Sequence, residues 1–294
     1  MKAITQDKYG MSDVLALSEI DKPTPKDDEV LVRVHSASIH PGDYFLMTGL
    51  PMIMRLGAGL SRPRKPTPGF DLAGVIEAVG KDVTEFQTGD EVFGEANGSC
   101  AEFVVTTAAK LALRPTNLSL AEAATVAVSG VTALRGIRDA GEVKPGQKVL
   151  INGASGGVGT FAVQIAKSLG AEVTGVCGTG NVDMVRSLGA DHVIDYTQED
   201  FTKGGSYDLI LDNVANRSFA EARRALAPTG KIIPNSGRSE GRWLGPMGRM
   251  AKSMLVSLFV RQQGRPFYAP IKREHLLALK ELIEAGEVKP VVAK

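Results

Sequence analysis

The pattern of hydrophobic and polar positions changes once along the chain. Up to about residue 115, short runs of alternating or branched apolar residues recur. They lie at 14–20, 29–38, 72–80 and 101–105, separated by glycine and proline. This spacing predicts a small β-barrel or sandwich. Helical periodicity is nearly absent here, and residues 50–68 show no clear period, which predicts a long loop.

A different pattern begins near Asn117. Ser119 is followed three residues later by Glu122, which predicts a helix capping box. From Lys148 onward, segments of strand and helix period alternate. We expect strands at 148–152, 172–177, 192–195, 207–214 and 230–236. We expect helices from near Gly157, at 181–189, at 216–226 and at 272–286, with Gly286 as the stop of the last. Such alternation predicts a parallel sheet covered on both faces, and therefore an α/β fold.

The helix after Gly157 has one apolar face. Steps of three and four residues place on it Val158, Phe161, Ala162, Ile165, Ala166 and Leu169. The chain resumes a strand-like pattern only at its end, at 288–294.

Composition narrows the class of protein. The 294 residues fit about two domains, and the formal net charge of +1 gives no field that would attract nucleic acid. Two cysteines, Cys100 and Cys177, exclude a disulfide framework and a four-cysteine zinc lobe, and fit a reducing cytoplasm. The N-terminus lacks the apolar core of a signal peptide, and the longest apolar run, 254–260, is too short to span a bilayer. We therefore expect a cytoplasmic location.

A glycine-rich turn at 152–167 supports two interpretations. Gly153–Gly157 spells the G-x-S-x-G of a hydrolase nucleophile elbow, with Asp212 and His275 following Ser155 in the order of a triad. Ala154, Gly156 and Gly159 come within one substitution of the G-x-G-x-x-G of a dinucleotide site. The strand before the turn and the helix and strand after it favour the dinucleotide site. His275 lies in a charged helical run, which predicts a solvated face.

Several segments together resemble the zinc-independent quinone oxidoreductases, the zeta-crystallin-like branch of the medium-chain dehydrogenase/reductase superfamily. They are 146–167, 68–80, 89–94, 128–134 and 188–196. The resemblance implies a Rossmann doubly wound parallel sheet plus a β-rich GroES-like catalytic domain, with the active site in the cleft between them. It implies a GroES-like domain at 1–117 with a return segment at 266–294, and a Rossmann domain at 118–265. The family's usual C-terminal strand and helix do not follow 288–294, so the return segment is expected to be truncated. The resemblance also implies a homodimer.

The resemblance bears on zinc. His40 lies where the surroundings of the first zinc ligand of alcohol dehydrogenases are expected, but Phe70 stands at the second ligand and 127–134 contains no cysteine. One ligand cannot replace three, so we predict no catalytic zinc. Without a metal, reduction of a quinone or an α,β-unsaturated carbonyl is favoured over alcohol oxidation. The candidate proton donors are His40 and Tyr44. For each, a structural role is the alternative: a hydrogen-bonded histidine and a packed tyrosine.

The cofactor is expected to be NADP(H) rather than NAD(H). Cys177 stands where NAD enzymes place a carboxylate for the ribose 2′-hydroxyl. The pyrophosphate is expected at Ala154, Ser155, Gly156, Gly157, Val158 and Gly159. The other cofactor residues that we predict are Thr132, Gly178, Asn181, Arg186, Tyr196, Asn213 and Ser236.

The composition of one segment suits contact with a further partner. Residues 242–265 mix arginine and lysine with Met, Leu, Phe and Trp243. Such a stretch is typical of contact with a membrane surface, and also of a lid or a subunit contact, which we favour. Two alternative functions stay open beside the reductase: an NADPH-binding crystallin-like protein without turnover, and a hydrolase acting through Ser155.

Overall fold

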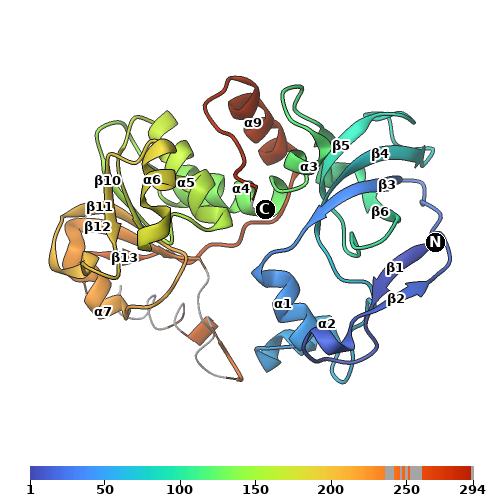
Figure 1. Ribbon diagram of the computed structural model, residues 1–294, viewed down its shortest axis with the longest axis horizontal. Coiled ribbons are helices and arrows are strands. Elements are labelled where there is room, and N and C mark those ends of the chain that lie inside the picture. Colours follow the sequence, from blue (N-terminus) through green and yellow to red (C-terminus); the bar gives the residue numbers. More distant parts are fainter. Residues whose placement is uncertain (236–241, 246, 249–250, 252–259, 293–294) are drawn as a thin grey trace. The chain divides into compact units, whose positions relative to one another are not determined.

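The computed structural model describes residues 1–235, 242–245, 247–248, 251 and 260–292 (Figure 1). The chain forms two compact units. The first comprises Met1–Val131, Pro270–Gly286 and Pro290–Lys294, and the second comprises Thr132–Ala269 and Glu287–Lys289. The change of unit at Val131 falls later in the chain than residue 117, because it lies inside helix α4 (Ala127–Leu134) rather than in a linker.

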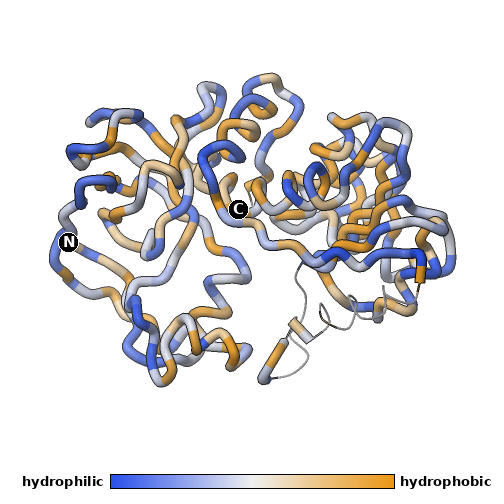
Figure 2. Tube along the Cα trace, turned by 180° about the vertical axis from the view of Figure 1, so that it is seen from behind, coloured by the Kyte–Doolittle hydropathy of each residue, from blue (hydrophilic) through white to orange (hydrophobic). Residues whose placement is uncertain are grey.

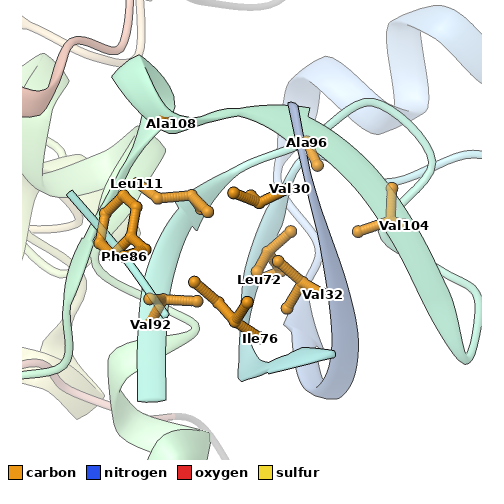
Figure 3. Close-up of a cluster of buried hydrophobic side chains, with 10 residues drawn as sticks. All are labelled: Val30, Val32, Leu72, Ile76, Phe86, Val92, Ala96, Val104, Ala108 and Leu111. Atoms are coloured by element: carbon orange, nitrogen blue, oxygen red, sulfur yellow. The ribbon is translucent and has the colours of Figure 1, made fainter. Parts of the chain in front are cut away.

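The first unit is built on antiparallel strands, as the alternating pattern predicts. Its five-stranded sheet has the order β6-β3-β4-β5-β7, and β1 pairs with β2 beside it. The bounds are β1 (Lys2–Thr5), β2 (Ala16–Glu19), β3 (Glu29–Ser38), β4 (Asp71–Val79), β5 (Glu91–Glu95), β6 (Phe103–Thr107) and β7 (Leu111–Leu113). Apolar side chains from these strands, among them Val30 and Leu72, converge with Phe86 from the loop between β4 and β5 on one buried core (Figure 3).

Helical structure in this unit is more extensive than its sequence period indicates. Helix α1 (Pro41–Thr48), a 3-10 turn at Met52–Met54 and helix α2 (Arg55–Ala58) interrupt the strands. The prediction that helix is nearly absent here was therefore wrong, and the predicted loop at 50–68 holds two short helical turns before an irregular stretch at 59–68. These elements are too short to show a period, and capping defines α1 instead. Pro41 is its first residue, and Gly49, at φ +62°, ends it.

Two further helices belong to the first unit. Helix α3 (Leu120–Ala123) has the predicted capping box, since Ser119 N–H donates to Glu122 Oε2 at 2.8 Å and Glu122 N–H donates to Ser119 Oγ at 3.3 Å. Helix α9 (Arg273–Glu284) ends before Gly286, whose φ of +76° confirms it as the stop.

The second unit contains a six-stranded parallel sheet of order β10-β9-β8-β11-β12-β13. The bounds are β8 (Lys148–Asn152), β9 (Glu172–Cys177), β10 (His192–Asp195), β11 (Tyr207–Asp212), β12 (Leu226–Pro234) and β13 (Gln263–Gly264). In chain order this is 3-2-1-4-5-6, the order of a dinucleotide-binding Rossmann sheet. The strand order reverses between β8 and β11, and a ligand site is expected where their carboxyl ends meet. Figure 2 shows hydrophobic residues concentrated along these strands.

Helices α5 (Gly157–Ser168) and α6 (Val182–Ser187) pack on the sheet, and α7 (Phe219–Ala222) precedes β12. Every residue of α5 from Gly159 to Ala166 is buried, so the buried surface is wider than the predicted stripe. It includes Gln164, whose Nε2 donates to Lys289 O at 2.9 Å and whose Oε1 accepts from Lys289 N–H at 3.0 Å. The described part of 288–294 is not a strand, and this reciprocal amide pair holds it instead.

Candidate active site

The glycine turn lies at the reversal of strand order, between the end of β8 and the start of α5. Gly153 has a φ of +78°, which L side chains rarely adopt. A Cβ at Gly159 would stand 2.0 Å from Gly153 O, so the helix can approach the turn only with glycine there. A Cβ at Gly156 would meet only Gly153 O, at 3.5 Å, an ordinary contact. Gly153 and Gly159 therefore serve the fold, whereas Gly156 leaves exposed space beside its Cα.

The backbone amides of the turn fall into two groups. Ala154 N–H donates to Val176 O at 2.9 Å, and Gly156 N–H donates to Gly153 O at 3.1 Å. Ala154 is fully buried, so neither its amide nor its side chain is directed to a ligand, and the prediction that it lines the pyrophosphate needs this correction. The first-turn amides of α5, at Gly157, Val158 and Gly159, have no acceptor within the helix. Together with the helix dipole, they give this end of α5 the character of an anion site.

Polar side chains fix the strand ends at the reversal. Asn152 and Asp212 are paired in register, and Asn152 Nδ2 donates to Asp212 Oδ1 at 2.8 Å and to Asn216 Oδ1 at 3.0 Å. Asp212 Oδ1 also accepts from the amides of Val214 at 3.2 Å and Ala215 at 2.9 Å. Asp212 thus shapes the loop after β11.

The other two residues of the hydrolase hypothesis are Ser155 and His275. Ser155 is partly buried in the turn. His275 belongs to the first unit, whereas Ser155 and Asp212 belong to the second. His275 is 6% exposed, so the prediction of a solvated position was wrong. Its place on the inner, apolar face of α9, beside Leu276 and Leu279, explains its burial.

The ends of β9 and β10 form the corner where the adenosine ribose is predicted. A Cβ at Gly178 would lie 3.1 Å from the Tyr196 hydroxyl, so the two predicted residues are adjacent, and Tyr196 is 60% exposed. Cys177 is buried and is paired in register with Asp195.

Asp195 is a carboxylate at this corner that the sequence analysis missed. Asp195 Oδ2 accepts from Thr179 Oγ1 at 2.6 Å, and Asp195 Oδ1 accepts from Thr197 N–H at 2.9 Å. These hydrogen bonds, the Thr179 bond first, hold the pKa of Asp195 below its usual value. Thr179, Thr197 and Gln198 donate hydrogen bonds to the Asp195 carboxylate, so groups of its own loop stabilise its charge.

The remaining predicted cofactor residues occupy several elements of the second unit. Arg186 lies on α6, 3.6 Å from Asp183 Oδ1, with its side chain 61% exposed. Asn181 is exposed and directly precedes α6, and Thr132 is partly buried in α4. Asn213 Oδ1 accepts from Asn235 Nδ2 at 2.9 Å, which joins the ends of β11 and β12. Ser236 lies outside the described residues.

In the first unit, His40 caps helix α1. His40 Nδ1 accepts from Gly42 N–H at 2.9 Å, while His40 N–H donates to Asp43 Oδ2 at 2.9 Å. Because Nδ1 is an acceptor, the neutral ring carries its proton on Nε2. That atom is buried and has no hydrogen-bond partner among the described residues, and Asp43 Oδ2 lies 3.7 Å away. Burial lowers the pKa of His40, which Asp43 partly offsets, and burial raises the pKa of Asp43. Tyr44, on the same helix, is 46% exposed.

A second buried carboxyl stands near this cluster. Asp71, at the start of β4, is 1% exposed and accepts from Val128 N–H at 2.7 Å and from Ser38 Oγ at 3.2 Å. Burial raises the pKa of Asp71 to about 8. The spacing of Asp43 from His40, three residues, is that of a capping box and could have revealed the pair. Nothing in the local sequence indicates that the pKa of Asp71 is raised.

The chemistry of this region does not fit a catalytic zinc. Phe70 stacks on the His40 ring at a centroid distance of 5.3 Å, so an aromatic ring takes the place expected for a second ligand. Val128 lies in the stretch 127–134 in which a third ligand is expected, and it offers only a backbone amide that is bonded to Asp71. In the described part of the chain, no group of three or more His, Cys, Asp or Glu side chains is placed to hold a metal ion.

The structure describes the basic and apolar segment 242–265 only in part, and residues 246, 249–250 and 252–259 lie outside the described residues. Within the described residues, no helix has both the length and the apolar character needed to cross a membrane.

Two family models match the chain: the alcohol dehydrogenase GroES-like domain over residues 26–135 and a zinc-binding dehydrogenase over residues 188–294. The 2-methylene-furan-3-one reductase of Solanum lycopersicum is 32% identical over 308 residues, which cover 99% of this chain and 71% of that protein. The chloroplast envelope quinone oxidoreductase homolog of Arabidopsis thaliana is 31% identical over 309 residues, covering 99% of this chain and 90% of that protein.

Solved structures agree with the sequence relatives. The Escherichia coli quinone oxidoreductase complexed with NADPH superposes with a TM-score of 0.83 at 26% identity, covering 100% of this chain and 91% of that chain. The fold, the glycine turn and these relatives together show an oxidoreductase that uses a nicotinamide cofactor on a small-molecule substrate. The chain belongs to the quinone oxidoreductase family, the zinc-independent branch of the medium-chain dehydrogenase/reductase superfamily.

Proposed function

We propose that the chain is an NADPH-dependent reductase that needs no zinc and transfers hydride to a quinone or an α,β-unsaturated carbonyl. The observation that carries the proposal is the glycine turn at the reversal of strand order, with the first-turn amides of α5 beyond it. The relatives support the acceptor class, since one is a furanone reductase and another a quinone oxidoreductase homolog.

The chain's own residues would hold the cofactor chiefly through backbone. The amides of Ser155, Gly157 and Val158 bind the pyrophosphate, and Gly156 lets it approach closely. Tyr196 flanks the adenosine beside Gly178, and Thr132 and Asn213 contact the nicotinamide end. Bound NADPH supplies the hydride.

Two features of the β9–β10 corner favour NADPH over NADH. The end of β9 carries Cys177, so no acidic side chain there receives the ribose 2′-hydroxyl. Asp195 is already bonded to Thr179 and Thr197. Arg186 then provides the positive charge for a 2′-phosphate, because the backbone N–H of Asn181 already donates to Gly178 O at 2.9 Å.

After hydride transfer the acceptor oxygen needs a proton. Tyr44 is the better placed of the two candidates, because it is exposed while the proton-bearing nitrogen of His40 is buried. His40 positions helix α1, and hence Tyr44, through its cap on Gly42. No metal enters this step, since the residues around His40 do not form a ligand set.

The assay follows the absorbance of reduced nicotinamide with a panel of quinones and enones, using NADPH and NADH in parallel. We expect turnover with NADPH at a higher kcat/KM than with NADH. A zinc chelator should leave both values unchanged. Tight NADPH binding without turnover on any acceptor would instead support the crystallin-like protein. Ester hydrolysis that Ser155→Ala abolishes would support the hydrolase. A cytoplasmic location and a homodimer stay predictions, testable by fractionation and light scattering.

A further inference from the structure

A pocket of about 460 Å³ lies within the first unit. Its apolar wall comes from helix α1, the 3-10 turn at Met52–Met54, helix α2 and the loop before β4, through Leu46, Met54, Ala58, Pro63, Pro68 and Phe70. Phe70 also stacks on His40. The volume suits a small ring system, and the apolar lining favours one.

Backbone hydrogen bonds hold the wall in place. Arg64 N–H donates to Ala58 O at 2.8 Å, and Gln6 N–H donates to Pro66 O at 2.8 Å. Tyr9 Oη donates to Gly59 O at 2.5 Å, which ties the end of α2 to the N-terminal segment. The loop from Gly59 to Pro66 is therefore anchored at both ends, and the pocket is formed by the fold itself.

The charge around this pocket has one sign. Between Asp43 and Asp71 the chain has no acidic residue and four cations, Arg55, Arg62, Arg64 and Lys65. Arg55 is engaged, because its guanidinium lies 4.3 Å from the centre of the Tyr9 ring and its Nε donates to Gly49 O at 2.9 Å. Arg64 and Lys65 line the pocket, are exposed, and form no ion pair with any described residue.

One buried polar group in the lining also lacks a partner. Gln6 is 5% exposed and lines the pocket, and its Oε1 has no hydrogen-bond partner among the described residues. A buried carbonyl oxygen without a donor costs free energy, which a ligand hydroxyl or amide N–H would recover.

We propose that this pocket binds an acceptor with an apolar ring and a carboxylate, which Arg64 and Lys65 hold. The inference rests on the proposed function and narrows its acceptor to anionic quinones or enones. An arginine beside a lysine favours a carboxylate, because the planar guanidinium forms two parallel hydrogen bonds with its two oxygens. Gln6 accepts a hydrogen bond from a hydroxyl or N–H on the ring.

The test compares three enones of one shape: 4-phenyl-3-buten-2-one and its para-carboxylate and para-carboxamide forms. We expect kcat/KM for the carboxylate to exceed that for the carboxamide by about tenfold, as one charge-assisted contact gives. In the double variant Arg64→Gln, Lys65→Gln this ratio should fall to about one. Arg62→Gln is the matched control, because Arg62 is on the same loop but lines a neighbouring pocket.

Equal kcat/KM for the carboxylate and the carboxamide in the unaltered protein would overturn the inference. So would an equal loss in Arg62→Gln, which would mean that the field of the loop, and not this pocket, attracts the anion. If no acceptor oxidises NADPH, the proposed function fails, and binding to the pocket is measured by calorimetry instead. Binding of the para-carboxylate should then weaken about tenfold in the double variant, and binding that ignores both substitutions contradicts the inference.

Discussion

The glycine turn of the second unit and the His40–Asp43–Asp71 cluster of the first are built in opposite ways. The turn is backbone, with a glycine wherever a Cβ would strike a neighbour, as at Gly159. The cluster consists of side chains. Asp43 and Asp71 are both buried, and His40 caps helix α1. A backbone site leaves a motif in the sequence, whereas a side-chain cluster depends on contacts made by distant segments. The two regions should therefore respond differently to substitution and to pH.

The largest effect is expected where the turn packs against α5. Gly159→Ala places a Cβ 2.0 Å from Gly153 O, a backbone atom that cannot rotate away. We expect a loss of roughly 3 kcal/mol in the free energy of unfolding of the second unit. Chemical denaturation measures it. Gly156→Ala is the control, and an equal loss in both variants would show that packing does not distinguish the two glycines.

The first unit should instead respond to pH through Asp71. Its pKa is about 8 in the folded protein against 3.8 in the unfolded chain, so the folded state binds the proton more tightly. The stabilising contribution is present below about pH 4 and is lost as the pH rises toward 8.

We expect Asp71→Asn to remove this dependence on pH. Between pH 5 and 8, the free energy of unfolding of the variant should therefore increase relative to that of the unaltered protein by about 1 kcal/mol per pH unit. The asparagine Oδ1 still accepts from Val128 N–H, and Ser38 Oγ can accept from Nδ2. Denaturation across this pH range measures the difference, and parallel curves for the two proteins would contradict the assignment.

The smallest effect on stability is expected at Arg186. Its pair with Asp183 is exposed, so Arg186→Gln should change the free energy of unfolding by less than about 0.5 kcal/mol. The same change should lower the ratio of kcat/KM for NADPH over NADH several-fold, because a 2′-phosphate loses a cation. Lys167→Gln, on α5, is a charge-matched control. A ratio that is unchanged in Arg186→Gln removes this residue from the cofactor site.

Much of this architecture could be predicted because periodicity and glycine spacing are local. Strands β3, β8, β9 and β10 begin and end where their patterns do, and Ser119 and Gly286 mark helix ends as expected. Helix α1 was missed because eight residues are too few for a period.

The missed site residues share another cause. Asp195 acquires its role from Thr179 and Thr197, and Asp71 from Val128, so each depends on segments brought together by the fold. Gln164 likewise meets Lys289 only in the folded chain. Burial and pairing of this kind have no signature at the residue itself.

The central claim is that the turn after β8 and the start of α5 bind the pyrophosphate of NADPH. Gly156→Val tests it directly, because a Cβ at that position makes only an ordinary contact with Gly153 O, and the side chain would occupy the exposed space where the cofactor would approach. Titration calorimetry with NADPH should show micromolar or tighter binding to the unaltered protein and at least a hundredfold weaker binding to Gly156→Val, with both proteins equally folded. Equal affinity in the two proteins, or no binding by the unaltered one, would contradict the claim.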